Sequence, residues 1–188
     1  KREYTRPLAE TRRLEVGTMI PERNGDSTLG WDEYQRGNVA VVFSTLFAAP
    51  TRKKELWDTL WYPDFDTARK LYRDQVNLYR KWTDAHSDKF RLISSTGELD
   101  AIIQHWSTPQ QEGEGHPVGL VMLMEGAEGI RSIKELPEWW ELGLRMIGLA
   151  WAGTRYCGGT GDPGGLTVEG RELISAMADF NFSLDISH

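Results

Sequence analysis

The sequence predicts an α/β fold built on parallel strands. Four apolar runs are separated by segments with helical periodicity, in the order strand, helices, strand, helix, strand, helix, strand. The runs are continuous rather than alternating, which predicts a sheet covered on both faces. A doubly wound sheet and a segment of a (β/α)8 barrel both fit this order, although no Gly-x-Gly-x-x-Gly motif follows the first strand. The strands, expected as parallel neighbours in chain order, are Val39–Phe47, Val118–Met124, Leu144–Ala150 and Phe182–Ile186.

Length and composition predict a single globular domain over residues 1–188. The chain is 39% hydrophobic and 27% charged, and its net charge of −6 argues against a nucleic-acid partner, because such partners require a basic face. A single cysteine, Cys157, excludes an internal disulfide and fits a reducing compartment. No apolar run approaches the roughly 20 residues of a transmembrane segment, and no signal peptide is visible. We therefore expect a cytoplasmic protein, and a homodimer is compatible with these features.

The first half of the chain is expected to contain a short helix, a strand and a long helix. The first thirty residues are rich in charge and show little periodicity, and a short helix is expected at Trp31–Arg36. The run Val39–Phe47 is rich in β-branched and aromatic residues, as buried strands are. A helix is then expected from Asp66, with an apolar face formed by Ala68, Leu71, Tyr72, Tyr79 and Trp82.

Two capping boxes mark helix starts in the middle of the chain. Ser95 with Glu98, and Ser132 with Glu135, place a hydroxyl and a carboxylate three residues apart. Pro137 follows the second box, so we expect either a one-turn start or a fresh start at that proline. The first of these helices follows a short extended piece at Phe90–Ile93, and its apolar stripe consists of Leu99, Ile102, Ile103 and Trp106.

Glu125 directly follows the strand Val118–Met124 and begins a glycine-rich turn. In parallel α/β folds the C-terminal ends of the strands carry the chemistry. The last strand has the same design, because Phe182–Ile186 delivers His188 at its end. We therefore expect Glu125 and His188 to lie close together at one mouth of the sheet. The competing interpretation of Glu125 is a solvated residue that begins a loop.

The segment Ala152–Gly165 is a glycine-rich loop after the third strand. Long loops in compact domains are usually functional or disordered, and a loop that follows a parallel strand is expected at the same mouth as Glu125. Arg155 and Tyr156 are its candidates for contact with a substrate carboxylate, Arg155 through a charge-assisted fork. An ordinary surface arginine is the alternative for Arg155. Thr167 is expected to cap the next helix.

The residue types of Glu125 and His188 favour a metal site. A carboxylate can bridge two cations, and a neutral imidazole binds one borderline metal such as zinc. Two ions held in this way can activate water and polarise a carbonyl in a hydrolase. Two ligands are nevertheless fewer than the four usual for zinc. The remaining histidines are interpreted as ordinary surface or capping residues: His86, His105 and His116.

Three motifs resemble successive signatures of the membrane (renal) dipeptidase family. They are Met124–Gly129 (MEGAEG), Leu166–Leu173 (LTVEGREL) and Leu184–His188 (LDISH). The corresponding family patterns are Val-Glu-Gly-Gly, Gly-Leu-Thr-x-x-Gly and Asp-Leu-Ser-His, in the same order and at similar spacing. Asn38–Ala48 also resembles the family's second barrel strand.

The resemblance implies a zinc-dependent dipeptidase with two ions in a (β/α)8 barrel, of which this chain carries strands two to five. In that family a metal-bridged hydroxide hydrolyses the peptide bond of a dipeptide substrate. By similarity, Glu125 would bridge both ions and His188 would bind the second. The substrate-contacting histidine after the family's fourth strand falls at Trp151, which makes Trp151 a substrate-binding candidate. Glu128 stands where a histidine is common.

The departures from the family pattern keep two other interpretations open. A first-strand His-x-Asp pair is expected just before Lys1, and a second metal-binding histidine, a carboxylate-binding arginine and a catalytic aspartate are expected after His188. The partial barrel is therefore expected to bind metal weakly, if at all, by itself. Trp151 in place of histidine leaves open a hydrolase of another small amide or an N-acyl amino acid. A non-catalytic α/β module with vestigial Glu125 and His188 is the third interpretation.

Overall fold

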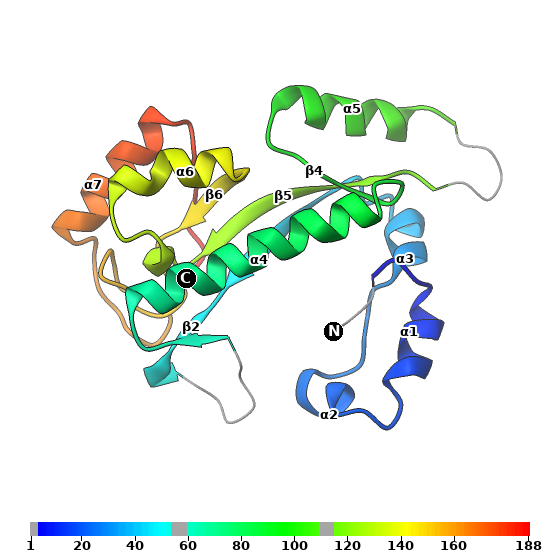
Figure 1. Ribbon diagram of the computed structural model, residues 1–188, viewed down its shortest axis with the longest axis horizontal. Helices are drawn as coiled ribbons and strands as arrows, with labels where there is room; N and C mark the ends of the chain where they lie inside the picture. The colour runs from blue at the N-terminus through cyan, green and yellow to red at the C-terminus, as the bar shows by residue number, and fades with distance from the viewer. Residues whose placement is uncertain (1–3, 54–59, 110–114) are drawn as a thin grey trace.

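A parallel sheet forms the centre of the computed structural model, which describes residues 4–53, 60–109 and 115–188 (Figure 1). The strand order is β1-β5-β6-β7, and every pairing between these strands is parallel. The predicted order of the four strands is therefore confirmed. A short fifth strand, β4, pairs with the beginning of β5. The bounds are β1 Val41–Phe47, β4 Phe90–Leu92, β5 Val118–Glu125, β6 Leu144–Gly148 and β7 Ser183–Asp185.

The register of the sheet aligns the C-terminal ends of its four main strands. Phe47 of β1 pairs with Glu125 of β5, and Glu125 pairs with Gly148 of β6. Gly148 in turn pairs with Asp185 of β7. Because side chains alternate across a strand, these paired positions lie on the same face of the sheet. The C-terminal ends of all four strands therefore form one edge, with Glu125 in the middle of it.

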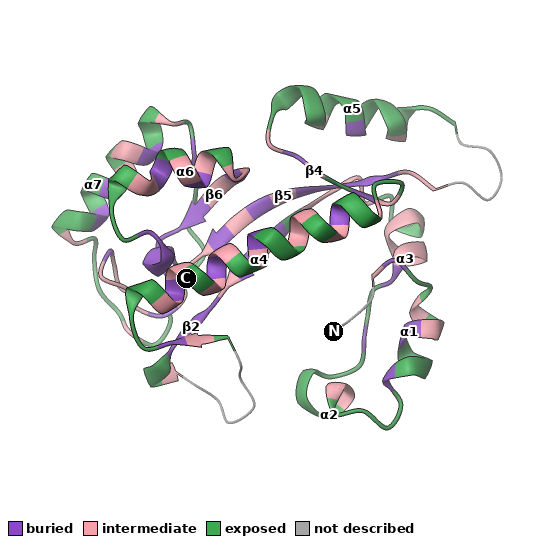
Figure 2. Cartoon of the chain, in the orientation of Figure 1, coloured by how far each residue is buried: buried purple, intermediate pink, exposed green. Residues whose placement is uncertain are grey.

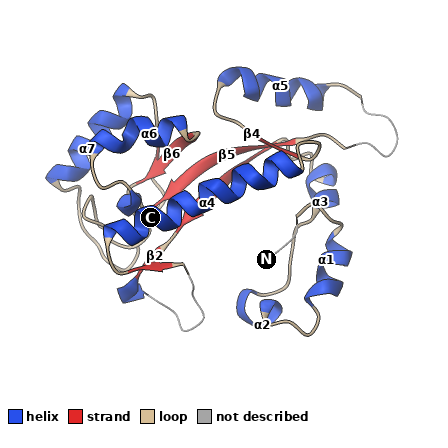
Figure 3. Ribbon diagram, in the orientation of Figure 1, coloured by secondary structure: helices blue, strands red, loops and turns tan. Residues whose placement is uncertain are grey.

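The crossover helices α4 (Phe65–Ala85), α6 (Leu136–Glu141) and α7 (Val168–Asp179) contribute to one core against the same face of the sheet (Figures 1 and 3). A doubly wound sheet would place such helices on both faces, so the arrangement agrees with the predicted partial (β/α)8 barrel. The buried residues of this core include Leu46, Tyr72, Val76, Met122, Met124, Trp139, Ile147, Leu173 and Met177.

The prediction that both faces of the sheet are covered is wrong for the described residues. Figure 2 shows the strands mixing buried and partly exposed positions. Leu46 on the helix-covered face is 0% exposed, whereas Phe43 on the opposite face is 60% exposed. The physical reason is that an apolar run reports suitability for burial and does not specify what covers each side.

The caps predicted at Ser95 and Thr167 are confirmed, whereas the capping box predicted for Ser132 with Glu135 is wrong. The Ser132 hydroxyl accepts from the backbone N–H of Lys134 instead, and the Glu135 carboxylate accepts from that of Arg131. Ser95 caps α5 (Thr96–Ser107) by accepting from the Glu98 backbone N–H, and Thr167 caps α7 by accepting from Gly170. Ser132 starts a single 3-10 turn at Ile133–Glu135, and α6 follows directly with Pro137 in its first turn. The one-turn start expected before Pro137 is therefore confirmed.

The N-terminal region contains two helices that the sequence reasoning missed, α1 (Leu8–Glu15) and α2 (Ile20–Asn24). The region is held partly by buried polar contacts: the Ser27 hydroxyl donates to the Glu15 carboxylate at 2.8 Å. Such contacts leave no apolar periodicity to detect. The short helix predicted at Trp31–Arg36 is present as α3.

Small features complete the fold. A two-stranded parallel sheet, β2 (Ala49–Pro50) with β3 (Trp61–Tyr62), and a 3-10 turn at Thr51–Lys53 lie beyond β1. Strand β6 ends at Gly148, two residues before the predicted end. Across the described ranges, the helices are all too short or too polar to span a membrane.

Candidate metal centre

Glu125 and His188 meet at the C-terminal edge of the sheet. The distance between His188 Nε2 and Glu125 Oε1 is 2.9 Å, and both side chains are partly exposed, at 32% and 23%. Glu125 is the last residue of β5, whereas His188 lies three residues beyond β7. Strand β6 lies between β5 and β7, so the contact spans two strand spacings. The structure thus brings together the two residues singled out from sequence.

The turn after Glu125 is shaped by two glycines and a tyrosine. Gly126 has a φ of +83°, a left-handed conformation that glycine adopts without strain. A Cβ at Gly129 would lie 2.5 Å from the ring of Tyr72, so this close contact requires glycine. The Tyr72 hydroxyl donates to the Glu125 carbonyl at 2.8 Å. Helix α4 therefore holds the backbone of Glu125 from the covered side of the sheet.

A compact turn after β7 directs the chain to His188. The Asp185 carboxylate accepts from the backbone N–H of Ser187 at 2.9 Å and also from its hydroxyl. Turns of this kind are typical of Asp with a short polar residue two positions later. The other imidazole nitrogen of His188, Nδ1, lies 2.9 Å from the hydroxyl oxygen of Thr160 in the glycine-rich loop. Both ring nitrogens thus have partners.

The pair satisfies part of a metal site. Two ligands bound to one tetrahedral ion at about 2.0–2.1 Å lie about 3.3 Å apart, close to the 2.9 Å between Nε2 and Oε1. A carboxylate oxygen and an imidazole nitrogen are also donors that zinc accepts. Within residues 4–53, 60–109 and 115–188, however, no three His, Cys, Asp or Glu side chains gather as a set that could hold an ion. The described residues supply two candidate ligands, Glu125 and His188.

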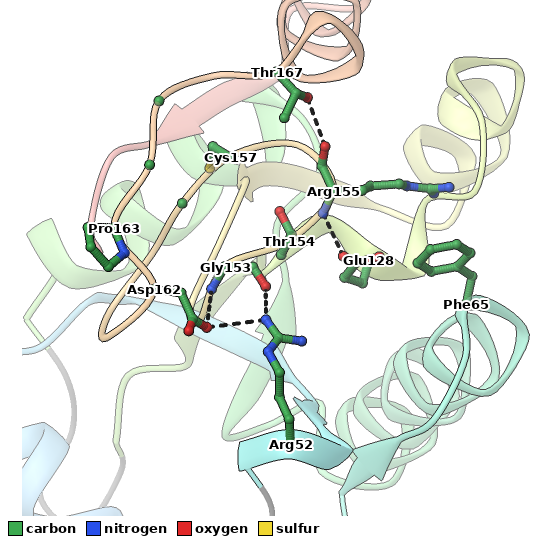
Figure 4. Close-up of a pocket in the computed structure, with 13 residues that line it drawn as sticks. Arg52, Phe65, Glu128, Gly153, Thr154, Arg155, Cys157, Asp162, Pro163 and Thr167 are labelled. Carbon is green, nitrogen blue, oxygen red and sulfur yellow. Dashed lines mark hydrogen bonds and ion pairs between the residues drawn. The ribbon is translucent and has the colours of Figure 1, made fainter.

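Asp162 connects the glycine-rich loop to the segment after β1 through hydrogen bonds and ion pairs. The Asp162 carboxylate accepts from Gly153 N at 3.1 Å and from Arg52 at 3.2 Å (Figure 4). Lys53 Nζ lies 3.5 Å from the same carboxylate. Arg52 also donates to the Gly153 carbonyl. The N–H donor and the two cations lower the pKa of the Asp162 carboxyl, the bond from Gly153 most of all. Ion pairs and backbone hydrogen bonds therefore both hold the loop in place.

A pocket of about 670 Å³ lies between this loop and the turn after β5 (Figure 4). Its lining mixes basic, acidic and aromatic side chains, and neither Glu125 nor His188 is among them. The pocket is therefore separate from the Glu125–His188 pair. Its main side chains come from Arg52, Phe65, Glu128, Arg155, Cys157 and Asp162.

The two loop candidates for substrate contact make internal contacts. Tyr156 is buried, and its hydroxyl donates to the Ile130 carbonyl. Arg155 donates to the same carbonyl and to the Tyr156 hydroxyl, and its guanidinium lies 4.2 Å from the centre of the Phe65 ring. Arg155 also lines the pocket. Their role toward a substrate stays a prediction.

Trp151 lies beside the candidate metal centre. Its ring packs edge-to-face against Phe47, with 5.1 Å between ring centres, and Phe47 is paired with Glu125 in the sheet. A Cβ at Gly126, next to Glu125, would lie 3.6 Å from the Trp151 backbone nitrogen. This position is compatible with the predicted contact between Trp151 and a substrate, which stays a prediction.

Glu128 is a buried carboxylate whose structural role sequence reasoning missed. It is 6% exposed, and one of its oxygens accepts from the backbone N–H of Arg155 at 2.8 Å. The other oxygen is buried without a partner in the described part of the chain. Burial raises the pKa of Glu128, against the lowering effects of Arg155 and Arg52. The only signal in the sequence was its place after Glu125, where the resemblance suggested histidine.

The fold belongs to the parallel α/β class, and Glu125 and His188 are its two candidate metal ligands at the C-terminal edge of the sheet. A family model described as membrane dipeptidase (peptidase family M19) matches residues 13–188. The chain therefore belongs to the membrane dipeptidase family, as the sequence motifs had indicated. A search of the curated proteins finds no match.

Three solved structures illustrate the fold. A metallopeptidase from Rhodobacter sphaeroides, liganded with a phosphinate mimic of the dipeptide L-Ala-D-Ala, is 21% identical, with a TM-score of 0.68 and coverage of 98% of this chain and 57% of that chain. A dipeptidase of family M19 is 21% identical, with a TM-score of 0.64 and coverage of 98% and 54%. The probable dipeptidase PvdM from Pseudomonas aeruginosa is 17% identical, with a TM-score of 0.66 and coverage of 99% and 45%.

At these identities the likeness shows the fold alone. The chain spans about half the length of the three solved chains. The predicted fold class, a parallel α/β fold that forms part of a (β/α)8 barrel, agrees with this likeness and with the sheet described above.

Proposed function

We propose that this protein is a metal-dependent dipeptidase that hydrolyses the peptide bond of dipeptides. The observation that carries the proposal is the 2.9 Å approach of His188 Nε2 to Glu125 Oε1 at the C-terminal edge of the sheet. Family membership supports the activity, and a solved relative is described as bound to a dipeptide mimic. The substrate, the choice of zinc and the use of two ions are parts of the proposal.

In this proposal Glu125 and His188 would hold the metal with different donor atoms. Glu125 would offer its two carboxylate oxygens, and His188 would offer an imidazole nitrogen. Bound divalent ions would supply Lewis-acid polarisation of the substrate carbonyl and would lower the pKa of a water molecule. The backbone bond from Tyr72 and the turn at Asp185 hold these two ligands in place.

Two aromatic side chains lie on one side of the pair. Trp151 and Phe47 form an aromatic wall beside Glu125. Arg155 is a candidate to bind the substrate carboxylate, provided that its contacts with Ile130 and Tyr156 open when substrate binds. A guanidinium is suited to that task because it donates two parallel hydrogen bonds.

A second candidate function is hydrolysis of N-acyl amino acids or other small amides on the same scaffold. Trp151, in place of the family's histidine, favours it, because an indole has a single N–H donor and a large apolar surface. Such a wall suits an acyl chain better than a charged amino terminus.

Metal content and substrate preference test both functions. The intact protein is loaded with zinc, its metal stoichiometry is measured, and hydrolysis is followed for a panel of dipeptides and of N-acyl amino acids with matched side chains. The first proposal expects bound zinc and faster turnover of dipeptides. Faster turnover of N-acyl amino acids would favour the second function, and a folded protein that binds no metal would contradict both.

A further inference from the structure

We propose that Thr160 is the positioning residue for His188: its hydroxyl fixes the imidazole so that Nε2 faces Glu125. The inference rests on the proposed function for the identity of the metal, whereas its geometry comes from the structure. Thr160 belongs to none of the motifs that indicated the family, and it lies in the glycine-rich loop.

The first step of the argument is the pair of contacts on the imidazole ring. Nδ1 of His188 lies 2.9 Å from Thr160 Oγ1, and Nε2 lies 2.9 Å from Glu125 Oε1. Two contacts on opposite sides of a ring determine its rotation about the Cβ–Cγ bond. Without the contact at Nδ1, the contact between Nε2 and Glu125 is left to hold the ring orientation, and the His188 side chain is 32% exposed.

The second step concerns the chemistry of a hydroxyl, which can both donate and accept. In a neutral imidazole that donates from Nε2 to the Glu125 carboxylate, Nδ1 carries no proton and accepts from the Thr160 hydroxyl. A metal on Nε2 requires the other tautomer, with the proton on Nδ1, which then donates to Thr160 Oγ1. The same side chain therefore satisfies Nδ1 in both states, which a carbonyl or a lysine in its place would not do.

The third step is that Thr160 is itself held in place. Its backbone N–H donates to the Trp151 carbonyl at 2.8 Å. The neighbouring Gly159 and Asp162 exchange backbone bonds of 2.9 and 3.0 Å, and the Asp162 carboxylate is anchored by Arg52. A Cβ at Gly159 would lie 2.7 Å from the Trp151 carbonyl oxygen, so this packing requires glycine. The backbone that carries the Thr160 hydroxyl is therefore held in place by these contacts.

Partners on the second nitrogen of a metal-binding histidine fix its tautomer and orientation, and their loss typically lowers metal affinity about 10- to 100-fold. We expect Thr160→Val, which keeps the shape and removes the hydroxyl, to weaken zinc binding by that factor. Thr160→Ser keeps the hydroxyl and should stay within about threefold of the parent. Affinity is measured by competition with a chromophoric chelator.

Thr154→Val is the matched control. Thr154 lies in the same loop, and its hydroxyl donates to the Leu149 carbonyl, away from His188. Its loss tests whether a general weakening of the loop is enough to lower zinc affinity. We expect little change with Thr154→Val. An equal loss of affinity in both valine variants would overturn the role of Thr160.

A second readout does not depend on the proposed function. In histidine-selective ¹⁵N NMR of the metal-free protein, assigned with His188→Gln, the Nδ1 resonance of His188 should have the shift of a hydrogen-bonded acceptor. Thr160→Val should move it to the shift of a free nitrogen, and Thr160→Ser should restore it. An unchanged resonance in Thr160→Val would refute the contact. A parent protein that binds no zinc but shows this shift would reject the metal function and retain the contact.

Discussion

Met124 and Glu125 are neighbours on β5, yet they face opposite sides of the sheet. Met124 is 0% exposed among the helices, whereas the Glu125 side chain is 23% exposed and contacts His188. The covered face is apolar and close-packed, and the opposite face carries the candidate ligands at its C-terminal edge. Because side chains alternate along β5, one face of this strand contributes to the core and the other carries a candidate ligand.

Tyr72 makes two contacts that link the helix-covered core to the backbone around Glu125. Tyr72 reaches from helix α4 on the covered side to the carbonyl of Glu125, and Gly129 packs against the Tyr72 ring. The position of the Glu125 carboxylate, the proposed metal ligand, thus depends on the core behind it. The two faces of the sheet thus differ in role, but a change in the core can shift the Glu125 side chain because both faces belong to the same strand.

The largest effect on stability is expected from Met124→Ala. Deleting a fully buried methionine side chain from the core costs about 2–5 kcal/mol of unfolding free energy. Denaturant unfolding measures the loss, and the metal stoichiometry of the remaining folded protein should be unchanged. Leu123→Ala, on the partly exposed face, is the control and should cost less. A larger loss for Leu123→Ala would contradict the assignment of the faces.

The largest effect on activity is expected from Glu125→Gln. Removing the charge that holds the ions should lower hydrolysis about 100-fold or more, whereas the unfolding free energy of the metal-free protein should change by less than about 1 kcal/mol. Activity and denaturation of the same preparation provide the test. Glu172→Gln, an exposed glutamate of α7, is the matched control. Full activity in folded Glu125→Gln would remove the carboxylate from the proposed metal centre.

A smaller effect is expected from Tyr72→Phe, which links the two faces. The variant leaves the Glu125 carbonyl without its hydroxyl partner, at a cost of about 1–3 kcal/mol in unfolding free energy. Because the carbonyl belongs to the proposed ligand Glu125, zinc affinity should fall too, by less than in Glu125→Gln. Stability loss without any change in zinc affinity would show that the core does not position the carboxylate.

The smallest effect is a pH dependence at Glu128. Burial raises the pKa of this carboxyl above its ordinary value of 4.5, so the folded state holds the proton more tightly than the unfolded state. The Glu128 contribution is therefore complete below pH 4.5 and is lost as pH rises through the raised pKa. Glu128→Gln should remove this loss, so the variant gains stability relative to the parent across that window. A difference that is flat with pH would contradict the raised pKa.

The strands and the ligand pair could be predicted from sequence because their signals are local. The apolar runs that became β1, β5, β6 and β7 indicate strands suited to burial, and parallel strands must end at a common edge. That rule alone placed Glu125 near His188. The capping hydroxyls of Ser95 and Thr167 were equally local, since each satisfies a backbone N–H three residues ahead.

Contacts between distant loops were decided only by the tertiary structure. Nothing in the residues around Thr160 indicates that its hydroxyl meets His188, and nothing around Arg155 indicates that its guanidinium donates to the carbonyl of Ile130. These partners depend on how the glycine-rich loop turns, and glycines permit many turns. The sequence by itself therefore determined the strands and their common edge. The packing of the loop over that edge decided which polar atoms meet, because hydrogen bonds require a direction that no hydrophobic pattern encodes.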